Sequence, residues 1–176
     1  MEKQQYDFYS GQIIDSAYQV HKEFGPGLLE SVYQFCLAEE LRRRNIKIRQ
    51  EVFLPLIYKG TPVNKDFRID LLIEEEIIVE VKAVDALAPI HEAQLLSYLK
   101  LSNKWLGLLI NFNVPVIKMG IKRWLMGIDR RGSFTSEKQS NFLCLCASVV
   151  NFDFNRSLKI YSTIIFQPGI PPRKLL

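Results

Sequence analysis

The sequence has few of the side chains that hold soft metal ions or form disulfides. Its 176 residues include two histidines and three cysteines, and Cys144 and Cys146 are separated by one residue rather than by the two typical of a zinc knuckle. Neither histidine, His21 or His91, lies at a ligand-like spacing from a cysteine. These absences argue against a zinc site. The odd number of thiols fits a reducing compartment, where cysteines usually act as small buried hydrophobes.

Long hydrophobic runs are absent as well. No stretch approaches the roughly 20 apolar residues of a membrane-spanning helix. Residues 1–5 are mostly polar and lack the apolar segment of a secretory signal. We therefore expect a soluble, cytoplasmic protein that does not associate with membranes.

A surplus of charge is absent from most of the chain. The net charge is +4, but residues 1–125 contain 16 Lys or Arg against 16 Asp or Glu, whereas residues 126–176 contain 7 against 3. A basic balance is therefore weak evidence for nucleic-acid binding, and that claim has to rest on a site. Because 48% of the residues are hydrophobic, the chain can form one core of reasonable size. We expect one domain over residues 1–125, followed by a basic C-terminal extension over residues 126–176 whose structure the sequence does not predict.

The spacing of apolar residues predicts the order of the elements. Apolar positions recur at three- and four-residue steps from about Ser10 to Phe24 and from about Leu28 to Arg44, which predicts two amphipathic helices separated by a Gly-Pro-Gly turn. A third helix is expected from about Ile90 to Leu101, after Pro89.

The segments between these predicted helices have the patterns of strands. Val52 to Tyr58 alternates with a two-residue period, and Phe67 to Ile73 and Ile77 to Lys82 are joined by the acidic link of residues 74–76. Trp105 to Phe112 is nearly all apolar and predicts a buried strand. The pattern weakens beyond Trp124, where residues 142–150 and 158–166 are weaker strand candidates. The sequence thus predicts an α/β fold with a mixed central sheet flanked by helices.

One group of charged residues lies within this apolar sheet. Asp70 is followed ten residues later by Glu80-Val81-Lys82. If the two strands form a hairpin, Asp70 and Glu80 lie near each other, and the two-residue period puts Glu80 and Lys82 on the same face. Burying these charges costs free energy unless they bind a metal or one another.

This pattern resembles the PD-(D/E)XK nuclease superfamily, whose motif is an acidic residue followed on the adjacent strand by Asp or Glu, any residue, and Lys. The predicted element order is similar to that superfamily's restriction-endonuclease-like core. Residues 27–33, with Gly27, Glu30 and Tyr33, also resemble the signature of the GxxExxY family, a bacterial branch. Gln94 and Tyr98 resemble the QxxxY element that follows the catalytic strands of RecB-like nucleases.

The resemblance implies a metal-dependent nuclease in which Asp70 and Glu80, helped by the main-chain carbonyl of Val81, hold Mg²⁺ or Mn²⁺. It implies that Lys82 orients or helps to deprotonate the attacking water, and that Glu30 completes the metal shell directly or through water. Hard cations of this kind prefer oxygen ligands.

The resemblance also implies roles for residues around this centre. Gln94 is expected to act in catalysis, and Tyr98 and Arg68 to bind the substrate. The expected partner is nucleic acid, with DNA taken as the substrate by analogy with most of the superfamily.

Several alternatives stay open from the residues themselves. Asp70, Glu80 and Lys82 can form a structural ion-pair group, and Glu30 can simply complement the helix dipole. Tyr33, which lies on the apolar face of its helix, is interpreted as a core residue with a satisfied hydroxyl. The chain as a whole can be a non-catalytic nucleic-acid-binding or interaction module that retains the nuclease fold, or a hydrolase of another phosphate ester.

Overall fold

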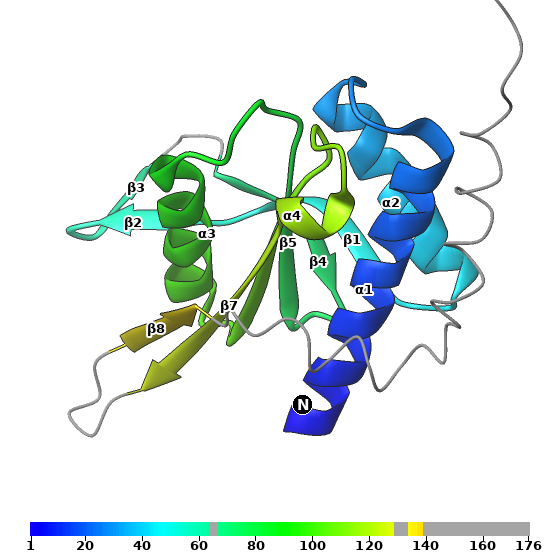
Figure 1. Cartoon of the computed structure of the whole chain (residues 1–176). Coiled ribbons are helices and arrows are strands. Elements are labelled where there is room, and N and C mark those ends of the chain that lie inside the picture. The colour runs from blue at the N-terminus through cyan, green and yellow to red at the C-terminus, as the bar shows by residue number, and fades with distance from the viewer. Residues whose placement is uncertain (64–66, 129–133, 139–176) are drawn as a thin grey trace, which may run out of the picture. The chain divides into compact units, whose positions relative to one another are not determined.

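The central feature of the fold is a six-stranded mixed sheet with the strand order β1-β4-β5-β6-β7-β8 (Figure 1). The computed structural model describes residues 1–63, 67–128 and 134–138. Its helices are α1 (Lys3–Phe24), α2 (Glu30–Arg43), α3 (Pro89–Ser102) and α4 (Ile117–Gly120). Its strands are β1 (Ile48–Phe53), β2 (Leu56–Tyr58), β3 (Thr61–Val63), β4 (Arg68–Ile73), β5 (Ile77–Lys82), β6 (Leu106–Asn111), β7 (Ile121–Ile128) and β8 (Phe134–Lys138).

Neighbouring strands in this sheet are antiparallel except for β5 and β6, which are parallel and are connected through α3. A parallel pair needs such a crossover, whereas β4 and β5 need only the short link of residues 74–76. Helices α1 and α2 lie on one side of the sheet and α3 on the other (Figure 1). The predicted α/β fold class, a mixed sheet flanked by helices, is confirmed.

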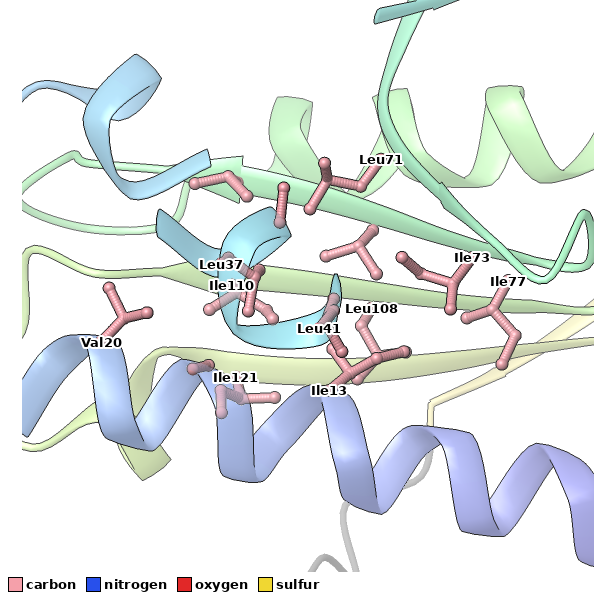
Figure 2. Packing of buried hydrophobic residues seen from close by; sticks show 14 of the residues in the cluster. Ile13, Val20, Leu37, Leu41, Leu71, Ile73, Ile77, Leu108, Ile110 and Ile121 are labelled. Carbon is pink, nitrogen blue, oxygen red and sulfur yellow. The ribbon is translucent and has the colours of Figure 1, made fainter. Parts of the chain in front are cut away.

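Two groups of buried residues hold these layers together. The first core cluster joins α1 and α2 to one face of the sheet, and Figure 2 shows Ile13 and Leu41 of these helices facing Leu108 and Ile77. The second core cluster joins α3 to the opposite face through Leu95, Leu99, Ile78 and Leu109. Both faces of the central strands are therefore buried, which explains why they are almost continuously apolar.

Helix α1 begins well before the predicted start near Ser10. Tyr6 is buried, and its hydroxyl donates a hydrogen bond to Glu76 Oε2 at 3.0 Å. The side-chain oxygen of Gln5 accepts a hydrogen bond from the Glu2 amide at 2.9 Å, which provides a partner for an amide at the start of the helix. Tyr6 and Tyr9 continue the apolar spacing that leads to Ile13, so the sequence did carry a signal for the earlier start of this helix.

The single strand predicted from Val52 to Tyr58 is wrong. Strand β1 ends at Phe53, and β2 pairs with β3 in a separate two-stranded sheet. Pro55 stands between the two strands and has no amide to donate to a continuous ladder. The Leu54 amide instead donates to the Phe67 carbonyl at 2.7 Å.

The boundary expected after residue 125 falls inside β7. That strand continues to Ile128 and pairs with β8 from Trp124↔Lys138 to Ile128↔Phe134. The sheet therefore extends into the segment that we treated as an extension. The strand candidates over residues 142–150 and 158–166 lie outside the described residues. In the described part of the chain, no helix is long and apolar enough to cross a membrane.

Candidate active site

The hairpin of β4 and β5 brings Asp70 next to the end of β5. The two strands pair in the register Ile73↔Ile77 to Leu71↔Val79, and the turn is closed by the Glu76 amide donating to the Ile73 carbonyl at 2.9 Å. Beyond the last regular pair, Asp70 Oδ2 accepts the Val81 amide at 2.8 Å. The aspartate side chain thus lies against the Glu80–Lys82 segment, as the hairpin argument predicted.

Glu80 is the most deeply buried charged group of the site. It is 1% exposed, and its carboxyl group is stabilised only weakly, by the Asp70 backbone and the Lys82 ammonium, both of which lower its pKa. It forms an ion pair with Lys82, whose Nζ lies 3.5 Å from Glu80 Oε2. Burial and then the negative charge of Asp70 raise the pKa of Glu80 to about 8, and Lys82 offsets only part of this.

Lys82 lies between two carboxylates from different elements. Its Nζ is 3.5 Å from Glu80 Oε2 on β5 and 3.6 Å from Glu30 Oε1 on α2. Burial lowers the pKa of Lys82, but the charges of Glu80, Asp70 and Glu30 outweigh it, so the pKa is raised. The side chain is therefore an ammonium at neutral pH.

The loop before α2 explains how Glu30 reaches this position. Gly27 has a φ of +106°, a backbone conformation that residues with a side chain rarely adopt. The Tyr33 hydroxyl donates to the Gly25 carbonyl at 2.6 Å and accepts the Leu28 amide at 3.0 Å, and its ring stacks on Phe112 at 4.5 Å between centroids. The interpretation of Tyr33 as a core residue with a satisfied hydroxyl is confirmed. Its contacts hold the loop so that α2 begins at Glu30.

The site carries an excess of negative charge. Burial raises the pKa of Asp70, and although the Val81 amide and Lys82 lower it, the charges of Glu30 and Glu51 raise it further. Asp70 interacts with Glu30 and Glu51, and Glu80 interacts with Asp70. Together with Lys82, these four carboxylates carry a formal charge of −3 when all are ionised. Such an arrangement favours the binding of a cation or the protonation of a carboxylate.

Sequence reasoning missed two residues of this site, Gln34 and Glu51. Gln34 Nε2 donates to Glu51 Oε1 at 2.6 Å and to the Asp70 carbonyl at 3.0 Å. Gln34 is four residues after Glu30 and so shares its face of α2, which is a signal that could have found it. Glu51 follows Gln50 in a strand and gives no comparable signal, because only the pairing of β1 with β4 places it near Asp70.

Gln94 and Tyr98 lie together on α3. Gln94 Nε2 donates to the Tyr98 hydroxyl at 2.9 Å, and the Tyr98 ring contacts Phe67 edge-on at 5.6 Å between centroids. Burial raises the pKa of Tyr98, and the charges of Glu80 and Asp70 raise it further, so Tyr98 lies within electrostatic range of the acidic residues. Their predicted helical pairing is confirmed.

Arg68 and Val81 occupy two different environments. Arg68 is the first residue of β4, is exposed, and pairs with Phe53. Val81 is fully buried in the first core cluster, and its backbone amide is the group that Asp70 binds.

The residues present fit a hard divalent cation that keeps part of its water shell. Among the described residues, no three side chains of His, Cys, Asp or Glu are close enough to hold a metal ion by themselves. Mg²⁺ is, however, usually held by one or two carboxylates together with waters and substrate phosphates. Asp70 and Glu80 supply two carboxylates, both raised in pKa by burial, and a cation between them would compensate the charge that Lys82 offsets only in part.

Comparison with protein-family models identifies the fold family. Residues 7–124 match the model described as the PD-(D/E)XK nuclease superfamily. The chain belongs to this superfamily. The match covers Asp70, Glu80 and Lys82 as well as the Gln94–Tyr98 segment, and the superfamily generally comprises metal-dependent nucleases. Membership supports a nuclease-type function and implies a nucleic-acid substrate. Comparisons with curated proteins and with solved structures gave no match. The narrower GxxExxY resemblance stays a prediction.

Proposed function

We propose that the protein is a divalent-metal-dependent nuclease that hydrolyses phosphodiester bonds of DNA at the Asp70–Glu80–Lys82 centre. The observation that carries this proposal is the Glu80 carboxyl group, which is 1% exposed and buried beside Asp70, with Lys82 Nζ 3.5 Å from its Oε2. A purely structural ion pair would be expected to balance its charges, whereas here Asp70, Glu80 and Glu30 share the one Lys82 ammonium, and burying an uncompensated carboxylate costs several kcal/mol.

The residues that would hold the cation are Asp70 and Glu80, with the main-chain carbonyl of Val81, and Mg²⁺ or Mn²⁺ matches these oxygen donors. When bound, such an ion supplies the Lewis acid of phosphodiester hydrolysis. It would also compensate the excess of carboxylates, and so favour the ionised form of Glu80, whose pKa burial raises to about 8.

Lys82 acts in this proposal as a fixed positive charge. Its ammonium forms ion pairs with the carboxylates of Glu80 and Glu30, and its raised pKa favours hydrogen-bond donation over proton abstraction. The ammonium can therefore orient a water and offset negative charge that develops on the scissile phosphate. Glu30 would act on the reaction mainly by holding Lys82.

Gln94, Tyr98 and Arg68 are assigned to substrate contact. The hydrogen bond from Gln94 leaves the proton of the Tyr98 hydroxyl available for a phosphate or sugar oxygen. Arg68 is exposed at the start of β4, two residues before Asp70, where a guanidinium can contact a phosphate.

The test is cleavage of DNA and RNA substrates by the wild type with Mg²⁺ or Mn²⁺, compared with Glu80→Gln and Lys82→Met. Both changes keep side-chain size but remove a charge, so we expect the rate to fall about 100- to 1,000-fold while the fold is retained. Glu23→Gln and Lys100→Met, which change exposed residues, are the matched controls and should cut like the wild type.

Cleavage that persists in EDTA, or in the Glu80 or Lys82 variant, would refute the mechanism. Binding of nucleic acid without cleavage of any substrate would instead support the non-catalytic module. RNA cleaved in preference to DNA would overturn only the choice of substrate.

A further inference from the structure

The pairing of β1 with β4 is interrupted opposite Asp70. Gln50 pairs with Leu71 and Val52 pairs with Ile69, but Glu51, between them, has a φ of +50°, and it does not form a regular pair with Asp70. A non-glycine residue in this left-handed region is uncommon, and for a residue inside a strand it costs free energy. The interruption therefore requires compensation from neighbouring groups.

The interruption also changes the face to which both strands turn their side chains. Ile48 of β1 and Leu71 of β4 pack in the first core cluster, whereas Val52 and Ile69 pack in the second. In a regular strand, residues two or four apart share a face. Both strands thus switch faces at the Glu51–Asp70 position, and the direction of the Asp70 side chain depends on this irregular backbone.

Gln34 is the side chain that ties this position to the rest of the protein. One nitrogen, Nε2, carries two protons, and it donates to Glu51 Oε1 at 2.6 Å and to the Asp70 carbonyl at 3.0 Å. It therefore connects α2 to both strands at the point where they do not pair with each other. The same helix carries Glu30 one turn earlier, so α2 contacts the site at Lys82 and at Asp70.

We propose that Gln34 is a positioning residue of the active site: with Glu51 it fixes the interrupted backbone at Asp70, and thereby holds the Asp70 carboxylate on the Val81 amide and beside Glu80. Gln34 itself touches neither the reacting atoms nor a cation. Its effect on metal binding and cleavage rests on the proposed function, whereas its effect on the geometry of Asp70 does not.

The first measurement is hydrogen exchange of the Val81 amide, which reports the Asp70 hydrogen bond directly. Gln34→Met keeps the length of the side chain but removes both donors. We expect Val81 to exchange at least about 10-fold faster in this variant, while Leu108 in the central strand β6 exchanges as in the wild type. Gln19→Met, at an exposed glutamine of α1, is the matched control.

A second variant tests the same contact from the other partner, in case Gln34→Met lowers the stability of the whole protein. Glu51→Asn introduces a residue that tolerates positive φ. Its side chain is shorter than that of glutamate and no longer reaches Gln34. We expect faster exchange at Val81 than in the wild type, again without a change at Leu108. Glu51→Gln keeps an acceptor oxygen for Gln34 and should leave the Val81 amide protected.

The second measurement is the affinity for Mn²⁺ by calorimetry. Removing groups that orient metal ligands typically weakens affinity about 10- to 100-fold, and we expect this loss in Gln34→Met and not in Gln19→Met. If the wild type binds no Mn²⁺, the proposed function fails, while the exchange measurement still decides the role of Gln34. Unchanged exchange at Val81 in Gln34→Met would overturn the positioning role, whatever the metal affinity.

Discussion

Individual residues of the site have environments or conformations that are uncommon for their residue type. Glu80 is buried with its pKa raised to about 8, and Lys82 stays charged because carboxylates surround it. Glu51 adopts a left-handed backbone conformation within a strand. Such departures from ordinary behaviour are typical of functional sites, since they are maintained by the surrounding structure rather than by the residue itself.

The raised pKa of Glu80 predicts how the stability of the metal-free protein depends on pH. Its pKa is 4.5 in the unfolded chain and about 8 in the folded one, so between these values the folded state binds more protons. The free energy of unfolding should therefore fall as the pH rises from about 4.5 to about 8, because the folded state must either keep the proton or bury a charge.

Urea denaturation in EDTA at several pH values measures this slope. In Glu80→Gln the slope over this window should become shallower, while the exposed Glu23→Gln should keep the wild-type slope. A wild-type protein that becomes more stable between pH 4.5 and 8, with the same profile in Glu80→Gln, would contradict the burial of an ionisable carboxyl at this position.

At the scale of elements, the site is assembled by three structures that meet at one end of the sheet. The β4–β5 hairpin supplies Asp70, Glu80 and Lys82, α2 supplies Glu30, and α3 supplies Tyr98. The hairpin is local in sequence, but α2 and α3 reach the site only because each packs on one face of the sheet. The loop that precedes α2 therefore helps to position Glu30 although it contains no charged residue.

Tyr33→Phe tests the role of that loop. The change keeps the ring that stacks on Phe112 but leaves the Gly25 carbonyl and the Leu28 amide without the hydroxyl that bridges them. We expect the free energy of unfolding to fall by about 1–3 kcal/mol in urea denaturation. Tyr18→Phe, at an exposed tyrosine of α1, should change it by about 0.5 kcal/mol or less. Equal effects of the two substitutions would show that the hydroxyl does not hold the loop.

For the whole molecule, the sheet extends beyond the segment that carries the motifs. Met126 of β7 is buried, and its amide donates to the Trp105 carbonyl at 2.8 Å. Strand β8 then pairs with β7 along five residues. The charge surplus lies elsewhere, since residues 139–176 contain four Lys or Arg against one Asp or Glu. Stability and affinity for polyanions should therefore depend on different parts of the C-terminal region.

Two truncated chains separate these contributions. A chain ending after residue 138 keeps β7 and β8 and should retain the melting temperature and metal binding of the full chain, whereas a chain ending after residue 124 should be clearly less stable. The chain ending after residue 138 should also bind nucleic acid more weakly, with a shallower dependence on salt, because cationic contacts to phosphate are removed. If the chain ending after residue 138 failed to fold, residues 139–176 would belong to the core.

The amino-acid sequence by itself determined the local structures and the chemistry of the central hairpin. Helices α2 and α3 and strand β5 follow from apolar periods and turn residues, and the spacing of Asp70 from Glu80 follows from a tight link between adjacent strands. Tertiary structure alone decided that Glu51 lies opposite Asp70 and that Gln34 binds both. The physical reason is range: periodicity and turns act over a few residues. The contacts of Gln34 with Asp70, by contrast, join groups 36 positions apart, whose meeting depends on how helices and strands pack.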